Sequence, residues 1–94
     1  MKQIIGGKTY NTSTAYSIGT RITIHKTKST GERVEWYETL YQRKKDDEYF
    51  IHKKVFQIDS SDRMYYTWEC INPISDSDME RWMMRKYKTV YEYE

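Results

Sequence analysis

Cysteine and proline are nearly absent from this chain, each occurring once, and this scarcity excludes several kinds of protein. A single cysteine, Cys70, allows no internal disulfide, and no set of cysteine and histidine residues has the spacing of a metal site. No apolar run approaches the roughly 20 residues that a membrane-spanning helix needs. The first residues, Met1 to Gly7, lack the hydrophobic region of a signal peptide. The sequence therefore predicts a cytoplasmic protein with no cofactor, metal or membrane contact.

Aliphatic residues are also scarce, whereas the chain contains ten tyrosines, three tryptophans and two phenylalanines. Such a composition predicts a core of aromatic and isoleucine side chains in which many rings are only partly buried. Charged residues make up 32% of the chain, yet the net charge is only +2. This balance excludes a strong polyanion-binding field and an acidic mimic of nucleic acid. A length of 94 residues predicts a single domain spanning 1–94.

The stretch from Trp36 to Val55 organises the predicted fold. It contains two runs of strand-forming residues, 36–41 and 49–52, separated by a charged break with Asp46 and Asp47 at its centre. This pattern predicts a long antiparallel hairpin. Further strands are expected over 20–27 and 64–71, and a short edge strand or arm over 3–5. Lys53-Lys54 interrupts the apolar pattern and predicts a strand end or bulge, and Asn72-Pro73 is expected to end the last of these strands.

Two helices are expected beside this sheet. A short one should run between the potential N-cap residues Asn11 or Thr12 and Gly19. A second should begin at Ser75, with Trp82 on its apolar face. The segment 89–94 fits either a final strand or an ordered tail. The predicted class is α+β: a twisted antiparallel sheet of about four to five strands, with a short N-terminal helix and a C-terminal helix packed on it.

The residues with reactive side chains form no catalytic motif. His25 and His52 each fall in a predicted strand without a neighbouring nucleophile, so we interpret them as ordinary strand residues. Cys70 follows Trp68 inside an apolar strand, which is typical of a buried structural thiol. The sequence therefore predicts a protein that is not an enzyme.

Two features of the hairpin predict binding surfaces. Basic residues near tyrosines form a mixture that suits nucleic acid, although a solvated strand end is the simpler interpretation, since acids at the same tip weaken the field. The surplus of tyrosines favours a protein partner, because tyrosine and arginine dominate protein–protein hot spots. The predicted partner-binding residues are Tyr37, Tyr41, Arg43, Lys44, Lys45, Tyr49, Lys53 and Lys54.

Several short motifs resemble a family of small proteins from phages and bacterial mobile elements. These motifs are Gly7 to Ala15, Glu38 to Tyr41, Tyr49 to His52, and the segment from Ile74 to Trp82. The chain departs from the family pattern where Asp46, Asp47 and Glu48 replace a turn glycine, after His52, and just before the helix tryptophan.

The resemblance implies that the protein belongs to a class that includes inhibitors of host defence, among them anti-CRISPR proteins. We therefore expect a phage-encoded inhibitor that binds a host defence protein, such as a Cas effector, in the bacterial cytoplasm and blocks it sterically. A small nucleic-acid-binding or regulatory phage protein is the alternative. A self-assembling module whose 90–93 tail pairs with a neighbour is a third possibility. Monomer and homodimer both remain open.

Overall fold

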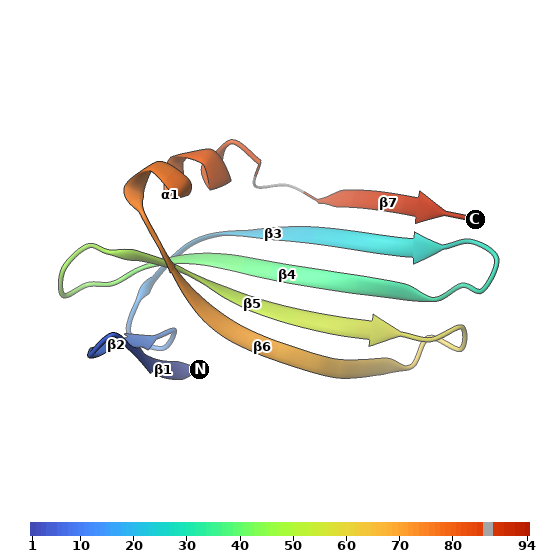
Figure 1. Cartoon of the computed structure of the whole chain (residues 1–94), viewed down its shortest axis with the longest axis horizontal. Coiled ribbons are helices and arrows are strands. Elements are labelled where there is room, and N and C mark those ends of the chain that lie inside the picture. The colour runs from blue at the N-terminus through green and yellow to red at the C-terminus, as the bar shows by residue number, and fades with distance from the viewer. Residues whose placement is uncertain (86–87) are drawn as a thin grey trace.

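The computed structural model describes residues 1–85 and 88–94, and most of them lie in strands (Figure 1). Among these residues, 61% lie in strands and 9% in a single helix. The predicted α+β class is therefore wrong, and the chain is a mainly β protein. The elements are β1 (Lys2–Ile5), β2 (Lys8–Asn11), β3 (Tyr16–Thr27), β4 (Arg33–Gln42), β5 (Tyr49–Ile58), β6 (Met64–Ile74), α1 (Asp76–Met83) and β7 (Thr89–Tyr93).

Five strands form one mixed sheet, in the order β6-β5-β4-β3-β7. Neighbouring strands are antiparallel except β7, which runs parallel to β3 (Figure 1). Strands β1 and β2 form a separate two-stranded sheet, called the N-terminal hairpin below. The segment 89–94, for which strand and tail were both open, thus contains an edge strand of the main sheet.

The hairpin predicted over Trp36 to Val55 is confirmed. Trp36 lies opposite Val55, and Leu40 opposite Ile51, in the antiparallel pair β4–β5. The second strand is longer than its predicted run, because β5 continues through the two lysines at 53 and 54 to Ile58. No strand end or bulge occurs at that lysine pair; the irregularity in β5 pairing falls between Val55 and Phe56, against β6.

The short helix predicted between Asn11 and Gly19 does not form. Asn11 does accept a backbone N–H, but the bond comes from Ser13 at 2.9 Å and closes a turn. The chain then enters β3 at Tyr16 and pairs with β4, with a register shift between Ser17 and Gly19. Pairing with β4 gives the backbone groups of this segment many hydrogen bonds, whereas an isolated helix of two turns is unstable in water.

Strand β6 also continues beyond its predicted end at Asn72-Pro73. Pro73 lies inside the strand, opposite Phe50, and the strand ends at Ile74. Proline lacks a backbone N–H. Because β6 is an edge strand, no neighbouring strand lies along its outer edge, and a missing donor on that edge leaves no hydrogen bond unmade. The edge position, which the sequence does not reveal, explains why proline is tolerated.

The C-terminal helix begins as predicted. The side chain of Ser75 accepts a hydrogen bond from the Asp78 backbone N–H at 3.2 Å. Arg81 lies in the last turn of α1, where a cation suits the helix dipole. Trp82 is 4% exposed and packs with Leu40 and Ile51, so the predicted apolar face is confirmed.

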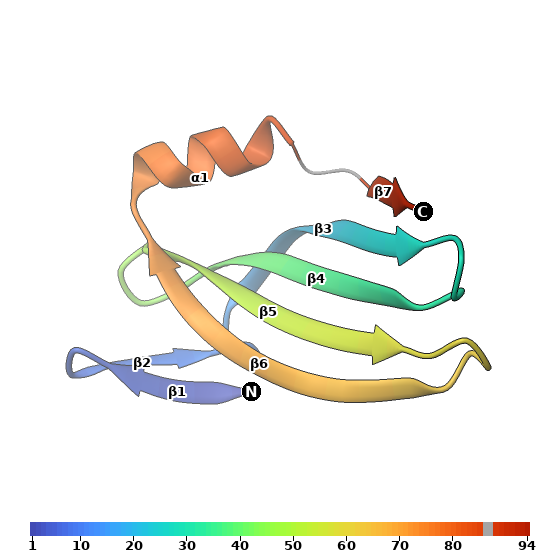
Figure 2. The ribbon, with the colours of Figure 1, turned by 45° about the vertical axis from the view of Figure 1, so that its right-hand side comes forward.

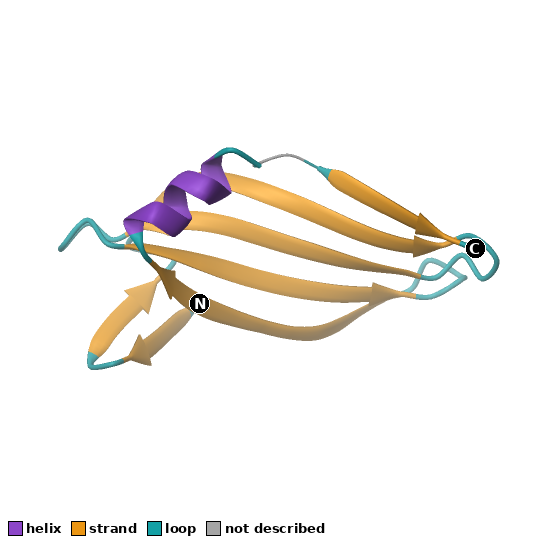
Figure 3. Ribbon diagram, turned by 45° about the horizontal axis from the view of Figure 1, so that its top comes forward, coloured by secondary structure: helices purple, strands orange, loops and turns teal. Residues whose placement is uncertain are grey.

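Two small cores lie on opposite sides of the main sheet. On one side, here called the helix face, α1 covers Leu40 and Ile51. On the other, the hairpin face, the N-terminal hairpin supplies Tyr10, which packs with Phe50 and Ile71. Figure 2 shows the helix and this hairpin on either side of the same end of the sheet, and Figure 3 shows that α1 reaches no further. Within the described residues, the remaining part of the sheet has no covering element.

Candidate functional site: an uncharged aromatic surface and a cationic groove

Beyond the row formed by Arg21, Glu38 and Lys53, the described residues of the helix face include no Asp, Glu, Lys or Arg on any of the five strands. Strand pairing and alternation place on this uncovered part of the face a set of residues that we call the aromatic half-face. In a chain of which 32% is charged, every member of this set is uncharged. The set is Thr23, His25, Val34, Trp36, Val55, Gln57, Tyr65, Trp68, Thr89, Tyr91 and Tyr93.

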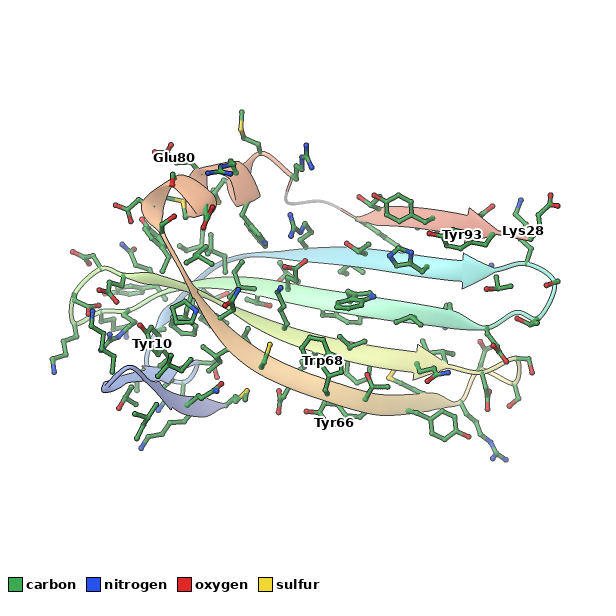
Figure 4. The ribbon with its side chains drawn as sticks, in the orientation of Figure 1. Tyr10, Lys28, Tyr66, Trp68, Glu80 and Tyr93 are labelled. Carbon is green, nitrogen blue, oxygen red and sulfur yellow. The ribbon has the colours of Figure 1, made fainter. Side chains whose placement is uncertain are left out.

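The rings of the aromatic half-face contact one another and are still open to solvent. Trp36 and Trp68 meet edge to face with centroids 5.7 Å apart. His25 stacks on Tyr91 at 5.0 Å and on Tyr93 at 5.9 Å, and its Nδ1 lies 3.0 Å from the Tyr93 hydroxyl. Exposure is 40% for Trp68, 48% for Tyr91 and 50% for Tyr93. Figure 4 shows Trp68 and Tyr93 beyond the reach of the helix.

An ion pair marks the border between the covered and uncovered parts of the helix face. Arg21 Nη2 lies 2.9 Å from Glu38 Oε1, and the Arg21 guanidinium lies 5.3 Å from the centre of the Trp82 ring. The Arg21 side chain therefore lies between the helix and the aromatic half-face. The coverage by the helix thus ends at a row of charged residues, in which Lys53 lies opposite Glu38 on β5.

On the hairpin face of the same sheet, two buried or half-buried carboxylates are paired with neighbouring side chains. Glu35 is 7% exposed and accepts hydrogen bonds from Arg33 at 2.7 Å and from the Tyr37 hydroxyl. Burial pushes the pKa of Glu35 upward, but these bonds outweigh it, so the pKa lies below its ordinary value. His52 Nε2 lies 2.7 Å from Glu69 Oε2, and that contact is the main cause of a lowered pKa at Glu69. These groups satisfy each other without an outside partner.

The predicted tyrosines occupy three different environments. Tyr37 bonds Glu35 on the hairpin face. Tyr41 lies on the same face but stacks on Phe50, with centroids 5.2 Å apart, beside the N-terminal hairpin. Tyr49 packs against the core beneath α1. All three are half-buried and contribute to the fold, and none belongs to the aromatic half-face.

The predicted basic residues separate into two groups. Lys53 and Lys54 are neighbours in β5 and therefore project from opposite faces of the sheet. Arg43, Lys44 and Lys45 lie together in the β4–β5 turn, where they line a groove of about 580 Å³. The N-terminal hairpin forms the other wall of this groove and adds two further cations, Lys2 and Lys8.

Simple alternation of side chains along β6 predicts the wrong face for Tyr66. It predicts Tyr66 and Trp68 on the same side, yet a register shift in the pairing of β5 with β6 intervenes between them. The Thr67 hydroxyl donates to the Val55 carbonyl at 2.6 Å at this point, and the two rings project from opposite faces. Tyr66 instead meets Phe56 on the hairpin face.

Comparisons with protein-family models, with curated proteins and with solved structures find no match. In the described ranges, no three His, Cys, Asp or Glu side chains are grouped so that they could hold a metal ion. No helix in that part of the chain is long and apolar enough to cross a membrane.

Proposed function

We propose that this chain is a non-enzymatic binding protein that docks its aromatic half-face on another protein. The observation that carries the proposal is a continuous set of uncharged, ring-rich side chains on five strands of a charged protein. Aromatic residues are enriched, and charged residues depleted, at the centres of protein interfaces. Half of the 47 × 25 Å outline of the molecule is on the order of 600 Å², approaching the ~800 Å² that each partner buries in a standard interface.

The rings are arranged before binding, which favours a stable complex. Trp36 is fixed against Trp68, and His25 against Tyr91, on strands that are hydrogen-bonded to their neighbours. Ordering a mobile side chain at an interface costs about 0.5–1.5 kcal/mol, and rings that are already packed avoid much of that cost. A rigid sheet can therefore present this surface without rearrangement.

In its specific form, the proposal is that the partner is a host defence protein such as a Cas effector, in the cytoplasm of the bacterial host. The sequence resemblance to small phage proteins supports this choice of partner. The chain measures 47 × 25 × 19 Å, so a docked copy is a flat, elongated obstacle. It would block nucleic-acid access or conformational closure by steric occlusion.

Two adjacent tyrosines provide a matched test. Tyr65 and Tyr66 are 50% and 56% exposed, but Tyr65 belongs to the aromatic half-face and Tyr66 to the hairpin face. The tagged chain is used to capture purified Cas effectors, with and without guide RNA, and the dissociation constant of any complex is measured. We expect Tyr65→Ala to weaken binding about tenfold or more, or about 1.4 kcal/mol, and Tyr66→Ala to leave it nearly unchanged.

Two results would overturn this proposal. Failure of every effector to bind at micromolar concentration would remove the Cas partner. Equal weakening by the two substitutions would remove the aromatic half-face as the contact surface, because both shorten a half-exposed tyrosine of the same strand.

A further inference from the structure

A second surface lies at the other end of the molecule, between the N-terminal hairpin and the β4–β5 turn. Segments that are far apart in the sequence meet there around the groove of about 580 Å³. Asp46 is its only acidic lining residue among the described residues. The cationic lining residues are Lys2, Lys8, Arg43, Lys44 and Lys45.

Two of these cations are held in place by contacts within the protein. The Arg43 guanidinium lies 4.9 Å from the centre of the Tyr10 ring and 2.9 Å from Asp46, and only 10% of its side chain is exposed. Lys8 pairs with Glu48 and lies 3.9 Å from Asp46. The acids of the turn therefore hold two cations in position, which leaves the others to supply the positive field.

Those others are Lys2, Lys44 and Lys45, which are exposed and which have no carboxylate within 4.0 Å in the described ranges. The Lys44 ammonium lies 4.8 Å from the centre of the Tyr16 ring. Tyr16 is 57% exposed, so a large ring lies open beside the groove. Cations along a groove with an open ring at its rim are the arrangement that single-stranded nucleic acid binds, through phosphates and a stacked base.

We propose that this groove binds the sugar–phosphate backbone of single-stranded nucleic acid, with Lys2, Lys44 and Lys45 on the phosphates and Tyr16 beneath a base. The site is separate from the aromatic half-face and does not depend on docking there. A rigid duplex presents its phosphates on a convex cylinder and would touch the rims, whereas a flexible single strand can follow the floor. The ring at the rim likewise favours an unpaired base over an acidic peptide.

The test is fluorescence anisotropy with a short labelled oligothymidine at low salt. We expect binding that weakens as salt rises, with a logarithmic slope of about −2, since each phosphate contact on a single strand contributes about −0.7. Alanine at Lys2, Lys44 and Lys45 together should weaken binding about tenfold or more. The matched control places alanine at Lys26, Lys54 and Lys88, which are exposed lysines outside the groove, and removes the same net charge. Tyr16→Ala should weaken binding with little effect on the salt slope.

Several results would overturn the proposal. Equal loss in the two triple variants would show a response to net charge alone. Absence of binding at low salt, or a duplex that binds more tightly than the single strand, would also contradict it. Displacement of the oligonucleotide by polyglutamate at matched charge would assign the groove to acidic proteins instead. None of these measurements involves the partner of the aromatic half-face, so the two proposals can fail separately.

Discussion

The substitution Trp82→Ala tests whether one buried ring holds the helix on the sheet. Trp82 is 4% exposed and joins α1 to Leu40 and Ile51. Burial of about 250 Å² at about 25 cal/mol/Å² gives at most about 6 kcal/mol, reduced by roughly 10–40% because the unfolded chain is partly compact. The Arg21 guanidinium, 5.3 Å from the ring centre, adds about 0.5–1 kcal/mol.

One feature of Trp82 acts in the opposite direction. Its buried Nε1 has no hydrogen-bond partner among the described residues, and an unpaired buried donor costs about 1–3 kcal/mol. Removing the whole side chain relieves that cost, so the net loss for Trp82→Ala is about 3 kcal/mol. Trp82→Phe keeps an aromatic ring and removes the unpaired N–H, and we expect its stability to stay within about 1 kcal/mol of the original chain.

The assay is unfolding by guanidinium and by heat, each followed by far-UV circular dichroism, because fluorescence would change with the loss of a tryptophan. A loss of about 3 kcal/mol corresponds to a fall of about 12 °C or more in melting temperature for a domain of this size. The eight-residue helix should also lose its signal early in the Trp82→Ala variant, since so short a helix depends on packing. A loss below about 1 kcal/mol for alanine, or a loss for phenylalanine as large as for alanine, would refute the reasoning.

Substitutions at three further positions have defined outcomes. Ser75→Ala removes the acceptor for the Asp78 N–H and should cost about 1 kcal/mol in thermal or chemical unfolding, whereas Ser75→Asp should not. Asp47 has a φ of 60°, so Asp47→Gly relieves a left-handed conformation and should raise stability by up to about 1 kcal/mol; a clear loss would contradict this account of the turn. Because the pKa of Glu69 is lowered in the folded state, mainly by its bond to His52, its contribution exists above the ordinary carboxyl pKa and is lost as pH falls through the folded value. As the pH is lowered below about 5, the free energy of unfolding should therefore decrease, and it should decrease less steeply in Glu69→Gln. Identical dependence of stability on acid pH in the two proteins would contradict this.

Sequence patterns correctly predicted the elements that are specified by residues close together in the chain. Two strand-forming runs around a charged turn predicted the hairpin at 36–55, and an N-cap with an apolar stripe predicted α1. Each of these features is specified by residues close together in the chain. Asp47, at the centre of that charged turn, has a left-handed backbone conformation with a φ of 60°.

The elements that were wrongly predicted depend on pairing between strands that are far apart in the sequence. The segment after Asn11 has a cap residue and a glycine at helical spacing, but it pairs with β4 on both sides of a single register shift, and Tyr16–Thr27 becomes a strand. Likewise, Pro73 is allowed inside β6 because that strand lies at the edge of the sheet. Neither the pairing nor the edge position can be read from nearby residues.

The candidate surfaces were only partly predictable for the same reason. Tyrosine excess indicated a protein-binding surface, but its location depends on where α1 ends, on the bulge at Thr67, and on the parallel pairing of β7 with β3. The groove combines the predicted Arg43, Lys44 and Lys45 with Lys2 and Lys8, which come from a hairpin that folds against the β4–β5 turn. That hairpin turns at Gly6 and Gly7, whose φ values of 58° and 79° are readily adopted by glycine.

The central claim is that the aromatic half-face is the surface through which the protein blocks its partner. It is tested most directly by measuring target-DNA cleavage by the captured Cas effector against increasing concentrations of the chain and of its Tyr65→Ala and Tyr66→Ala variants. We predict inhibition by the original chain and by Tyr66→Ala at similar concentrations, and inhibition by Tyr65→Ala only at concentrations about tenfold higher or more. Cleavage that proceeds unchanged with the original chain, or equal inhibition by the two variants, would contradict the claim.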